Sequence, residues 1–211
     1  MARNTAPHSS RSPGTKAALP VQRARHEVRI IGGAWKRTPL TVLDRPGLRP
    51  TPSRVRETLF NWLGGDLTGW RCIDVFAGTG ALGFEAASRG ARDVLLVEQD
   101  SVLVAALRGL QSRLGATALR VVQGDGIAAL RGCATGSTDL VFLDPPFDSV
   151  RYDEALQAAS EALAPQGLVY LEAAGAWTAE QLRAHGLLLH RQLKAGAVVA
   201  HLLKKEPVRH A

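Results

Sequence analysis

Short apolar runs alternate with helix-like segments over most of the chain. Runs of about four to six apolar residues between polar or glycine residues are typical of buried strands, whereas apolar residues spaced three and four apart are typical of helices. Because the two alternate, the pattern predicts an α/β fold with a parallel sheet. The predicted strands are 71–76, 94–97, 119–123, 140–143 and 168–171, and the predicted helices are 81–88, 101–114, 127–130 and 152–163.

Two hairpins depart from this alternation. Residues 187–193 and 198–203 predict an antiparallel hairpin at the end of the chain, which brings the sheet to seven strands. Near the beginning, residues 28–31 and 40–42 flank a glycine pair and predict a small N-terminal β-hairpin extension. The chain is therefore expected to have one large α/β unit with an appendage.

Trp35 lies beside Lys36 and Arg37 in the predicted N-terminal hairpin. An aromatic ring among cations offers a stacking surface that suits RNA. Trp35 could equally cap the small core of the hairpin, and the sequence leaves both interpretations open.

Residues 45–56 form a basic, proline-containing segment that leads into a predicted helix over 53–63. Ser53 suits the N-cap position of this helix. Arg54 and Arg56 then fall in the first turn, where the helix dipole disfavours positive charge. We therefore expect these two arginines to face an anion.

Positive charge is concentrated near the N-terminus. The net charge is +7, but residues 1–56 hold twelve lysines and arginines and two acids, and the remainder of the chain is slightly acidic. This distribution predicts a polyanionic partner approached from one side. Residues 1–26 lack apolar periodicity and are predicted to be a disordered basic tail, which either attracts phosphates non-specifically or is simply solvated.

The composition also indicates the cellular compartment in which the protein is expected. The two cysteines, Cys72 and Cys133, have no C-x-x-C partner, which favours free thiols in a reducing compartment. The N-terminal residues contain no apolar h-region, and no run of 18 apolar residues occurs. A cytoplasmic protein without membrane spans is therefore expected.

A glycine-rich turn, D-V-F-A-G-T-G-A-L-G from Asp74 to Gly83, follows the first strand of the alternating region. Glycines let the backbone approach a ligand closely, and the next helix offers free N–H groups at its N-terminus. Gly78, Gly80 and Gly83 fit the spacing G-x-G-x-x-G, and Glu98 follows twenty residues after the first of them, as in dinucleotide sites. Taken alone, the turn suits either NAD or S-adenosylmethionine.

Acidic residues end four of the predicted strands, at the edge where such sheets bind ligands. A single acid there is often only a helix N-cap, but four in register indicate a site. Glu98 is placed to accept from ribose hydroxyls, and Asp125 from an adenine amino group. Asp74 suits a cationic methionine amino group and would repel a pyrophosphate, which argues against NAD. The candidate cofactor-binding residues are Asp74, Phe76, Ala77, Gly78, Thr79, Gly80, Gly83, Glu98, Gln99, Asp125 and Gly126.

The fourth acid opens the candidate catalytic loop, Asp144-Pro145-Pro146-Phe147. Two prolines stiffen the loop, so that the Asp144 carboxyl and the Pro145 carbonyl form converging acceptors for an exocyclic amino group. Accepting both amino hydrogens localises the nitrogen lone pair and directs it at an electrophile. Phe147 can stack on the base, which would flip out of a duplex to reach it. The alternative is a Pro-Pro turn closed by a core phenylalanine.

Together these stretches resemble the S-adenosylmethionine-dependent N-methyltransferases of nucleic-acid amino groups, and more closely the bacterial 16S ribosomal RNA guanine-N2 methyltransferase family. That family shows R-I-I-G-G-x-W, then R-P-T-x-x-R-V-R-E-T-L-F-N-W-L, D-x-F-A-G-[T/S]-G-A-L-G and D-P-P-F. The chain departs from it after Trp35, where K-R-T replaces R-G-R. The resemblance covers about residues 28–205, with the four motifs in order at 29–35, 49–63, 74–83 and 144–147.

The resemblance implies a Rossmann-like methyltransferase fold and in-line methyl transfer from S-adenosylmethionine to N2 of a guanine in 16S rRNA. It also implies an assembling 30S particle as partner. We further expect a monomer, and catalysis mainly by positioning with no metal, because positive charge at sulfur falls as the methyl group leaves. The expected organisation is a tail over 1–26, a hairpin and RNA-binding extension over 27–52, and a methyltransferase domain over 53–211. The candidate RNA-binding residues are Arg29, Trp35, Lys36, Arg37, Arg49, Thr51, Arg54 and Arg56.

Three other functions remain open from the sequence. A DNA adenine-N6 or cytosine-N4 methyltransferase fits the D-P-P-F motif but not the N-terminal motifs. An NAD dehydrogenase fits the glycine turn but not Asp74. An RNA-binding assembly factor without catalysis would not need the four strand-end acids.

Overall fold

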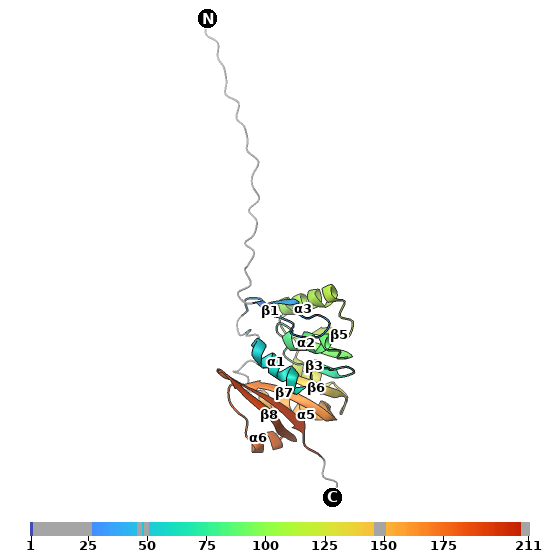
Figure 1. Ribbon diagram of the computed structural model, residues 1–211, viewed down its shortest axis with the longest axis vertical. Coiled ribbons are helices and arrows are strands. Elements are labelled where there is room, and N and C mark those ends of the chain that lie inside the picture. Colours follow the sequence, from blue (N-terminus) through green and yellow to red (C-terminus); the bar gives the residue numbers. More distant parts are fainter. Residues whose placement is uncertain (2–26, 46–47, 49–50, 146–150, 208–211) are drawn as a thin grey trace.

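The computed structural model describes residue 1, residues 27–45, residue 48, residues 51–145 and residues 151–207. The predictions made for the tail over 1–26, for Arg49, and for Pro146 and Phe147 of the candidate catalytic loop concern residues outside this set. In Figure 1 the small β1–β2 sheet lies at the same end of the molecule as α3, and strand β8 lies at the opposite end.

Seven strands form one sheet in the order β5-β4-β3-β6-β7-β9-β8. Strands β3 to β7 pair in parallel, and β9 pairs antiparallel with both β7 and β8. The predicted mostly parallel sheet with a C-terminal antiparallel hairpin is confirmed. The strands are β3 (Arg71–Asp74), β4 (Asp93–Glu98), β5 (Leu119–Gln123), β6 (Thr138–Leu143), β7 (Leu163–Ala173), β8 (Leu187–Ala195) and β9 (Val198–Lys205).

Six helices are found in the described part of the chain. The predicted helix over 101–114 has the same first and last residues as α3 in the structure. The shortest helix, α6, was missed, although Thr178 and Gln181 form a capping box at its start. The helices are α1 (Ser53–Trp62), α2 (Ala81–Ser88), α3 (Ser101–Leu114), α4 (Gly126–Arg131), α5 (Tyr152–Ala162) and α6 (Ala179–Arg183).

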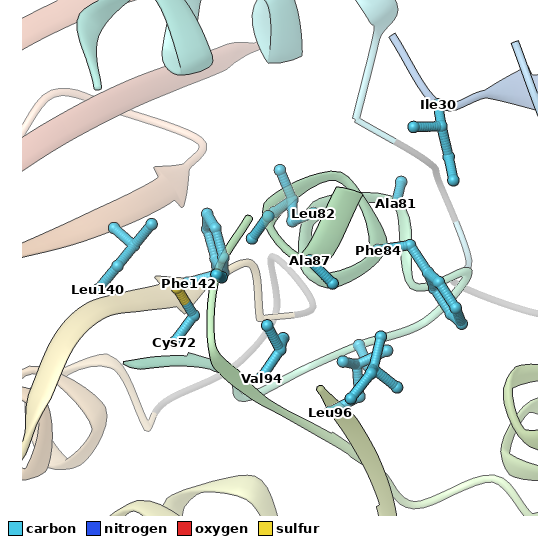
Figure 2. Packing of buried hydrophobic residues seen from close by; sticks show 14 of the residues in the cluster. Ile30, Cys72, Ala81, Leu82, Phe84, Ala87, Val94, Leu96, Leu140 and Phe142 are labelled. Carbon is cyan, nitrogen blue, oxygen red and sulfur yellow. The ribbon is translucent and has the colours of Figure 1, made fainter. Parts of the chain in front are cut away.

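Helices cover both faces of the sheet, because successive strand residues point to opposite sides. Helices α1, α2 and α3 share one hydrophobic cluster with Val94 and Phe142. Helices α4, α5 and α6 share the other with Val97 and Val141. Figure 2 shows the first cluster, in which side chains of α2 such as Leu82 meet those of β3, β4 and β6.

The start of α1 differs from the prediction. Pro52 occupies the N-cap position and no side chain caps the helix, so Ser53 is its first residue. The Ser53 hydroxyl instead accepts a hydrogen bond from Arg56 at 3.3 Å. The Ser53 side chain therefore binds the Arg56 side chain within α1 and does not cap the helix backbone.

The N-terminal extension is a two-stranded antiparallel sheet of β1 (Glu27–Arg29) and β2 (Pro39–Thr41). Its glycine pair docks on α2. The backbone N–H groups of Ile31 and Gly32 donate to the two carboxylate oxygens of Glu85 at 2.6 and 2.8 Å. Gly33 has a φ of 72°, and a Cβ there would lie 1.8 Å from the Ser88 carbonyl oxygen. The R-I-I-G-G segment therefore requires glycine in order to seat the extension on α2.

Arg56 joins this extension to α1 from within the core, where its side chain is 0% exposed. Its guanidinium donates to the carbonyl oxygens of Arg29 and Thr51 at 3.0 and 3.3 Å. It also lies 3.9 Å from the Glu85 carboxylate. Burial lowers the pKa of Arg56, and the negative charge of Glu85 opposes that change. The expectation that Arg56 faces RNA is corrected, because the group has no exposed surface.

Candidate active site

A cavity of about 850 Å³ opens at the C-terminal edge of the parallel strands. It lies where the strand order reverses, beside β3 and β6, which is where open α/β sheets bind ligands. Arg45, Leu48 and Thr51 line it from the segment before α1, and Ala197 and Val198 line it from the β8–β9 hairpin. Segments from both ends of the chain therefore converge on one site.

The glycine turn forms one wall of this cavity. Gly80 has a φ of 77° and occupies the N-cap position of α2. The N–H of Gly78 donates to Glu98 at 2.8 Å, and that of Gly83 donates to Asp74 at 3.0 Å. Two of the strand-end acids thus fix the backbone of the turn. Its cavity-lining residues include Phe76, Ala77, Gly78 and Thr79.

Asp74 is 2% exposed, yet it lines the cavity. Burial raises the pKa of Asp74 to about 7, the negative charge of Glu98 adds to the rise, and the hydrogen bond from Gly83 opposes it. Asp74 forms no ion pair within the part of the chain that the structure describes. A cation bound beside it would therefore stabilise its charged form.

Glu98 is held by backbone donors on both carboxylate oxygens. Besides the Gly78 N–H, it accepts from the N–H groups of Gln99 and Asp100 at 2.8 and 2.9 Å. Both Glu98 and Gln99 line the cavity. The carboxylate is thus fixed in place, and its contact with a ribose stays a prediction.

Asp125 combines two structural contacts. It caps α4 by accepting from the Ala128 N–H at 3.0 Å, and it forms a 2.6 Å ion pair with Arg151, which lowers the pKa of Asp125. Gly124 and Gly126 on either side line the cavity, and so does Arg151. The N-cap interpretation is therefore confirmed for Asp125, while a contact with adenine stays a prediction. Sequence reasoning missed Arg151.

Asp144 and Pro145 follow β6 and line the same cavity as the glycine turn. The Thr51 hydroxyl donates to Oδ2 of Asp144 at 3.4 Å. Burial, followed by the nearby carboxyls of Glu172 and Asp74, raises the pKa of Asp144 well above its usual range, and the hydrogen bond from Thr51 opposes the rise. Thr51 was expected on an RNA-binding surface, but it is only 5% exposed and lies beside Asp144.

Glu172, near the end of β7, is a site residue that the sequence reasoning missed. It is 3% exposed and lines the same cavity. The buried Tyr170 hydroxyl donates to its Oε1 at 2.7 Å. Burial raises the pKa of Glu172, and the hydrogen bond from Tyr170 opposes the rise. The first four acids were identified because they follow parallel strands at the ligand-binding edge of the sheet. Glu172 follows the fifth predicted strand in the same way and could have been identified from the sequence.

The cavity carries an excess of acidic groups. Its two arginines have acidic partners, since Arg45 lies 3.4 Å from Asp100 and Arg151 pairs with Asp125. Among the described residues, no cluster of three or more His, Cys, Asp or Glu side chains is placed to hold a metal ion. The donor set fits an organic cation better than a pyrophosphate. Within the described ranges, the lining acids without an ion pair are Asp74, Glu98, Asp144 and Glu172.

The remaining RNA-binding candidates lie on the extension and on α1. Lys36, Arg37 and Arg54 are exposed, and Arg29 is exposed while it donates to the Arg37 carbonyl at 3.0 Å. Trp35 is partly buried and packs against the first hydrophobic cluster. This packing favours a role in the core of the extension, and the exposed part of the ring remains available for stacking on RNA. No helix that the structure describes is long and apolar enough to span a membrane.

The strand order, the glycine turn and the acids at the strand ends define a Rossmann-like fold of the methyltransferase class. A solved structure described as a putative methyltransferase from Escherichia coli has a similar fold, with a TM-score of 0.74 and 36% identity. That likeness covers 86% of this chain and 99% of the other.

The chain belongs to the family described as Conserved hypothetical protein 95, whose model matches residues 28–204. It is 39% identical over 182 residues to Ribosomal RNA small subunit methyltransferase D of Escherichia coli, covering 85% of this chain and 91% of that protein. It is 40% identical over 154 residues to the protein of the same name from Haemophilus influenzae, covering 71% and 80%. The family resemblance predicted from the motifs is confirmed.

Proposed function

We propose that the protein transfers a methyl group from S-adenosylmethionine to the exocyclic N2 amino group of a guanine in small-subunit rRNA. The observation that carries the proposal is the placement of Asp144 and Pro145 in one cavity with the glycine turn. The names of the relatives support an rRNA substrate. The guanine target rests on the sequence motifs and on the acceptor groups of the site.

The cofactor half of the cavity consists of the turn over 74–79 with Glu98, and Asp125 lies beside it between the lining residues Gly124 and Gly126. S-adenosylmethionine would supply an electrophilic methyl group on a sulfonium. Asp74 would face its ammonium group, which suits a carboxyl that is buried without a cation. Glu98 would accept from a ribose hydroxyl through Oε2, which has one backbone donor and keeps a second lone pair, whereas Oε1 already accepts from two N–H groups.

The acceptor half consists of Thr51, Asp144, Pro145 and Glu172. Asp144 and the Pro145 carbonyl would accept the two hydrogens of the amino group, which localises the nitrogen lone pair toward the glycine turn. As the new N–C bond forms, the bond between sulfur and the methyl group would break and leave a neutral thioether, and the surplus proton on nitrogen would pass to the Asp144 carboxyl or to water. Positioning supplies most of the acceleration, so that Asp144 need not be a strong base. The stacking role of Phe147 remains part of this proposal.

The exposed basic residues of the extension and of α1 would hold the RNA phosphates. Lys36, Arg37 and Arg54 are exposed on segments that are joined to the cavity wall through Arg56 and Thr51. Each phosphate that such a group neutralises releases counterions, so affinity should fall steeply with salt. We expect a cytoplasmic monomer that acts on an assembling 30S particle.

Methyl transfer from labelled S-adenosylmethionine to naked 16S rRNA, 30S particles and duplex DNA tests the proposal. We expect label in N2-methylguanine of rRNA and none in DNA. Label in adenine or cytosine of DNA would establish a DNA methyltransferase instead. Cofactor binding without transfer to any substrate would indicate a non-catalytic assembly factor.

A further inference from the structure

Glu172 presents a buried acceptor immediately beside the one that the proposed reaction uses. Its carboxyl is 3% exposed, lines the cavity with Asp144, and lies close enough to raise the pKa of Asp144. No lysine or arginine in the described ranges forms an ion pair with either carboxyl. A buried carboxyl without a cation is costly unless N–H or O–H donors reach it.

The protein fixes Glu172 as an acceptor. The Tyr170 hydroxyl, buried at 0% exposure, donates to its Oε1 at 2.7 Å. Burial raises the pKa of Glu172, and the hydrogen bond from Tyr170 opposes that rise by favouring the charged form. A charged carboxylate has no hydrogen to donate, so it attracts an N–H group and repels a lone pair. The other titratable groups that face the two carboxyls are Asp74, Tyr152 and Tyr170.

The three exocyclic amino groups of nucleic acids differ in their neighbours on the ring. The N2 amino group of guanine lies beside N1–H, which is a donor. The N6 amino group of adenine lies between the lone pairs of N1 and N7, and the N4 amino group of cytosine lies beside the lone pair of N3. Two adjacent acceptors therefore match the two neighbouring donors of guanine. With adenine or cytosine, one of the two acceptors would face a ring lone pair.

The depth of the two carboxyls fits the orientation of the base. In guanosine the sugar is attached on the N3 side of the amino group, and N1–H lies on the far side. Because the sugar and its phosphates stay at the mouth of the cavity, N1–H enters deepest. Asp144 is partly exposed, whereas Glu172 is buried. The less exposed residue, Glu172, is thus assigned to N1–H, and the more exposed Asp144 to the amino group.

We propose that Glu172 is the specificity residue that selects guanine, by accepting its N1–H while Asp144 accepts its N2 amino group. This inference rests on the proposed function and deepens it, because it explains which of the three amino-bearing bases the cavity takes. The selection includes a repulsive element, the carboxylate placed against a lone pair. A site built for an N–H strongly rejects an analogue that lacks it.

Replacing the target guanine by 2,6-diaminopurine tests the inference. This base keeps the 2-amino group but carries a lone pair at N1. With rRNA made by ligating a synthetic segment at the mapped position, wild-type kcat/KM should fall by about 100-fold relative to guanine. In Glu172→Gln the amide can accept from Tyr170 and donate to N1, so the ratio should shift toward diaminopurine by at least about 10-fold.

The ratio of the two bases is measured within one preparation, so it does not depend on how much of a variant is folded. Tyr170→Phe should relax the ratio less than Glu172→Gln, and Glu161→Gln on the exposed surface of α5 should leave it unchanged. Equal wild-type rates on both bases, or an equal loss of both in Glu172→Gln, would overturn the role of Glu172. Failure of the wild type to methylate guanine would instead overturn the proposed function, and this inference with it.

Discussion

The cofactor half and the acceptor half of the cavity hold their carboxyls in different ways. In the cofactor half, Glu98 accepts three backbone N–H groups, and Asp125 has a helix N-terminus and an arginine. In the acceptor half, Asp144 and Glu172 have only hydroxyl groups of Thr51 and Tyr170 as partners among the described residues. Glu98 and Asp125 therefore have their donors before any ligand binds, whereas we expect Asp144 and Glu172 to gain donors from a ligand.

Asp74 belongs to the cofactor half but shares one feature with the carboxyls of the acceptor half. Its carboxyl accepts one backbone N–H, as the acids of the cofactor half do, but it is buried without a cation. We therefore expect the two halves to separate in mutagenesis. Changes in the acceptor half should remove turnover and spare cofactor binding, and changes in the cofactor half should alter binding and stability.

The largest effect is expected from Asp144→Ala. The change removes a positioned acceptor from the reacting nitrogen, so kcat should fall by about 100- to 1,000-fold or more. The dissociation constant for S-adenosylmethionine, measured by calorimetry, should stay near that of the wild type. Wild-type turnover in this variant would show that Asp144 does not contact the acceptor.

A smaller effect is expected from Asp74→Asn, which should raise the stability of the free protein. The pKa of Asp74 is about 7 in the folded protein and about 3.9 in an unfolded chain, so its contribution to stability is present below about pH 4 and is lost as pH rises through 7. Asparagine does not titrate and still accepts from the Gly83 N–H. At pH 8 the variant should be more stable by about 2–4 kcal/mol, with weaker cofactor binding.

Thermal or urea unfolding of the free protein between pH 5 and 8 checks this prediction. The advantage of Asp74→Asn should shrink as pH falls toward 5. An advantage that stays constant over that range would mean that Asp74 is not the titrating group.

Glu98→Ala should give the next effect in size. The carboxylate joins the glycine turn to the end of β4 through Gly78 and Gln99. Leaving these N–H groups without an acceptor should cost about 1–3 kcal/mol of stability and weaken cofactor binding by about 10- to 100-fold. Turnover at saturating cofactor should stay within a few-fold of the wild type. A matched change at the exposed Glu161 should alter neither quantity.

Much of the fold follows from local pattern. The apolar runs gave the order of strands and helices, since each strand is short, buried and bounded by polar or glycine residues. The strand-end rule placed Asp74, Glu98 and Asp144 around one cavity because the carboxyl ends of parallel strands share an edge. Glu172 obeys the same rule, so its omission was an incomplete use of the sequence.

Other features depend on contacts between distant segments and could not be obtained locally. Arg56 resembles a surface arginine in its helix, yet its partners Arg29 and Glu85 lie far from it in the sequence and remove it from solvent. The Gly32-Gly33 pair likewise gains its meaning only when Glu85 and Ser88 of α2 are in place.

Mass mapping of N2-methylguanine in small-subunit rRNA tests the central claim most directly. In cells lacking the protein, one guanine should lose its N2-methyl group, wild-type protein should restore it, and Asp144→Ala should not. If every N2-methylguanine of the small subunit is retained when the protein is absent, the account of the cavity as a guanine-N2 methyl-transfer site is contradicted.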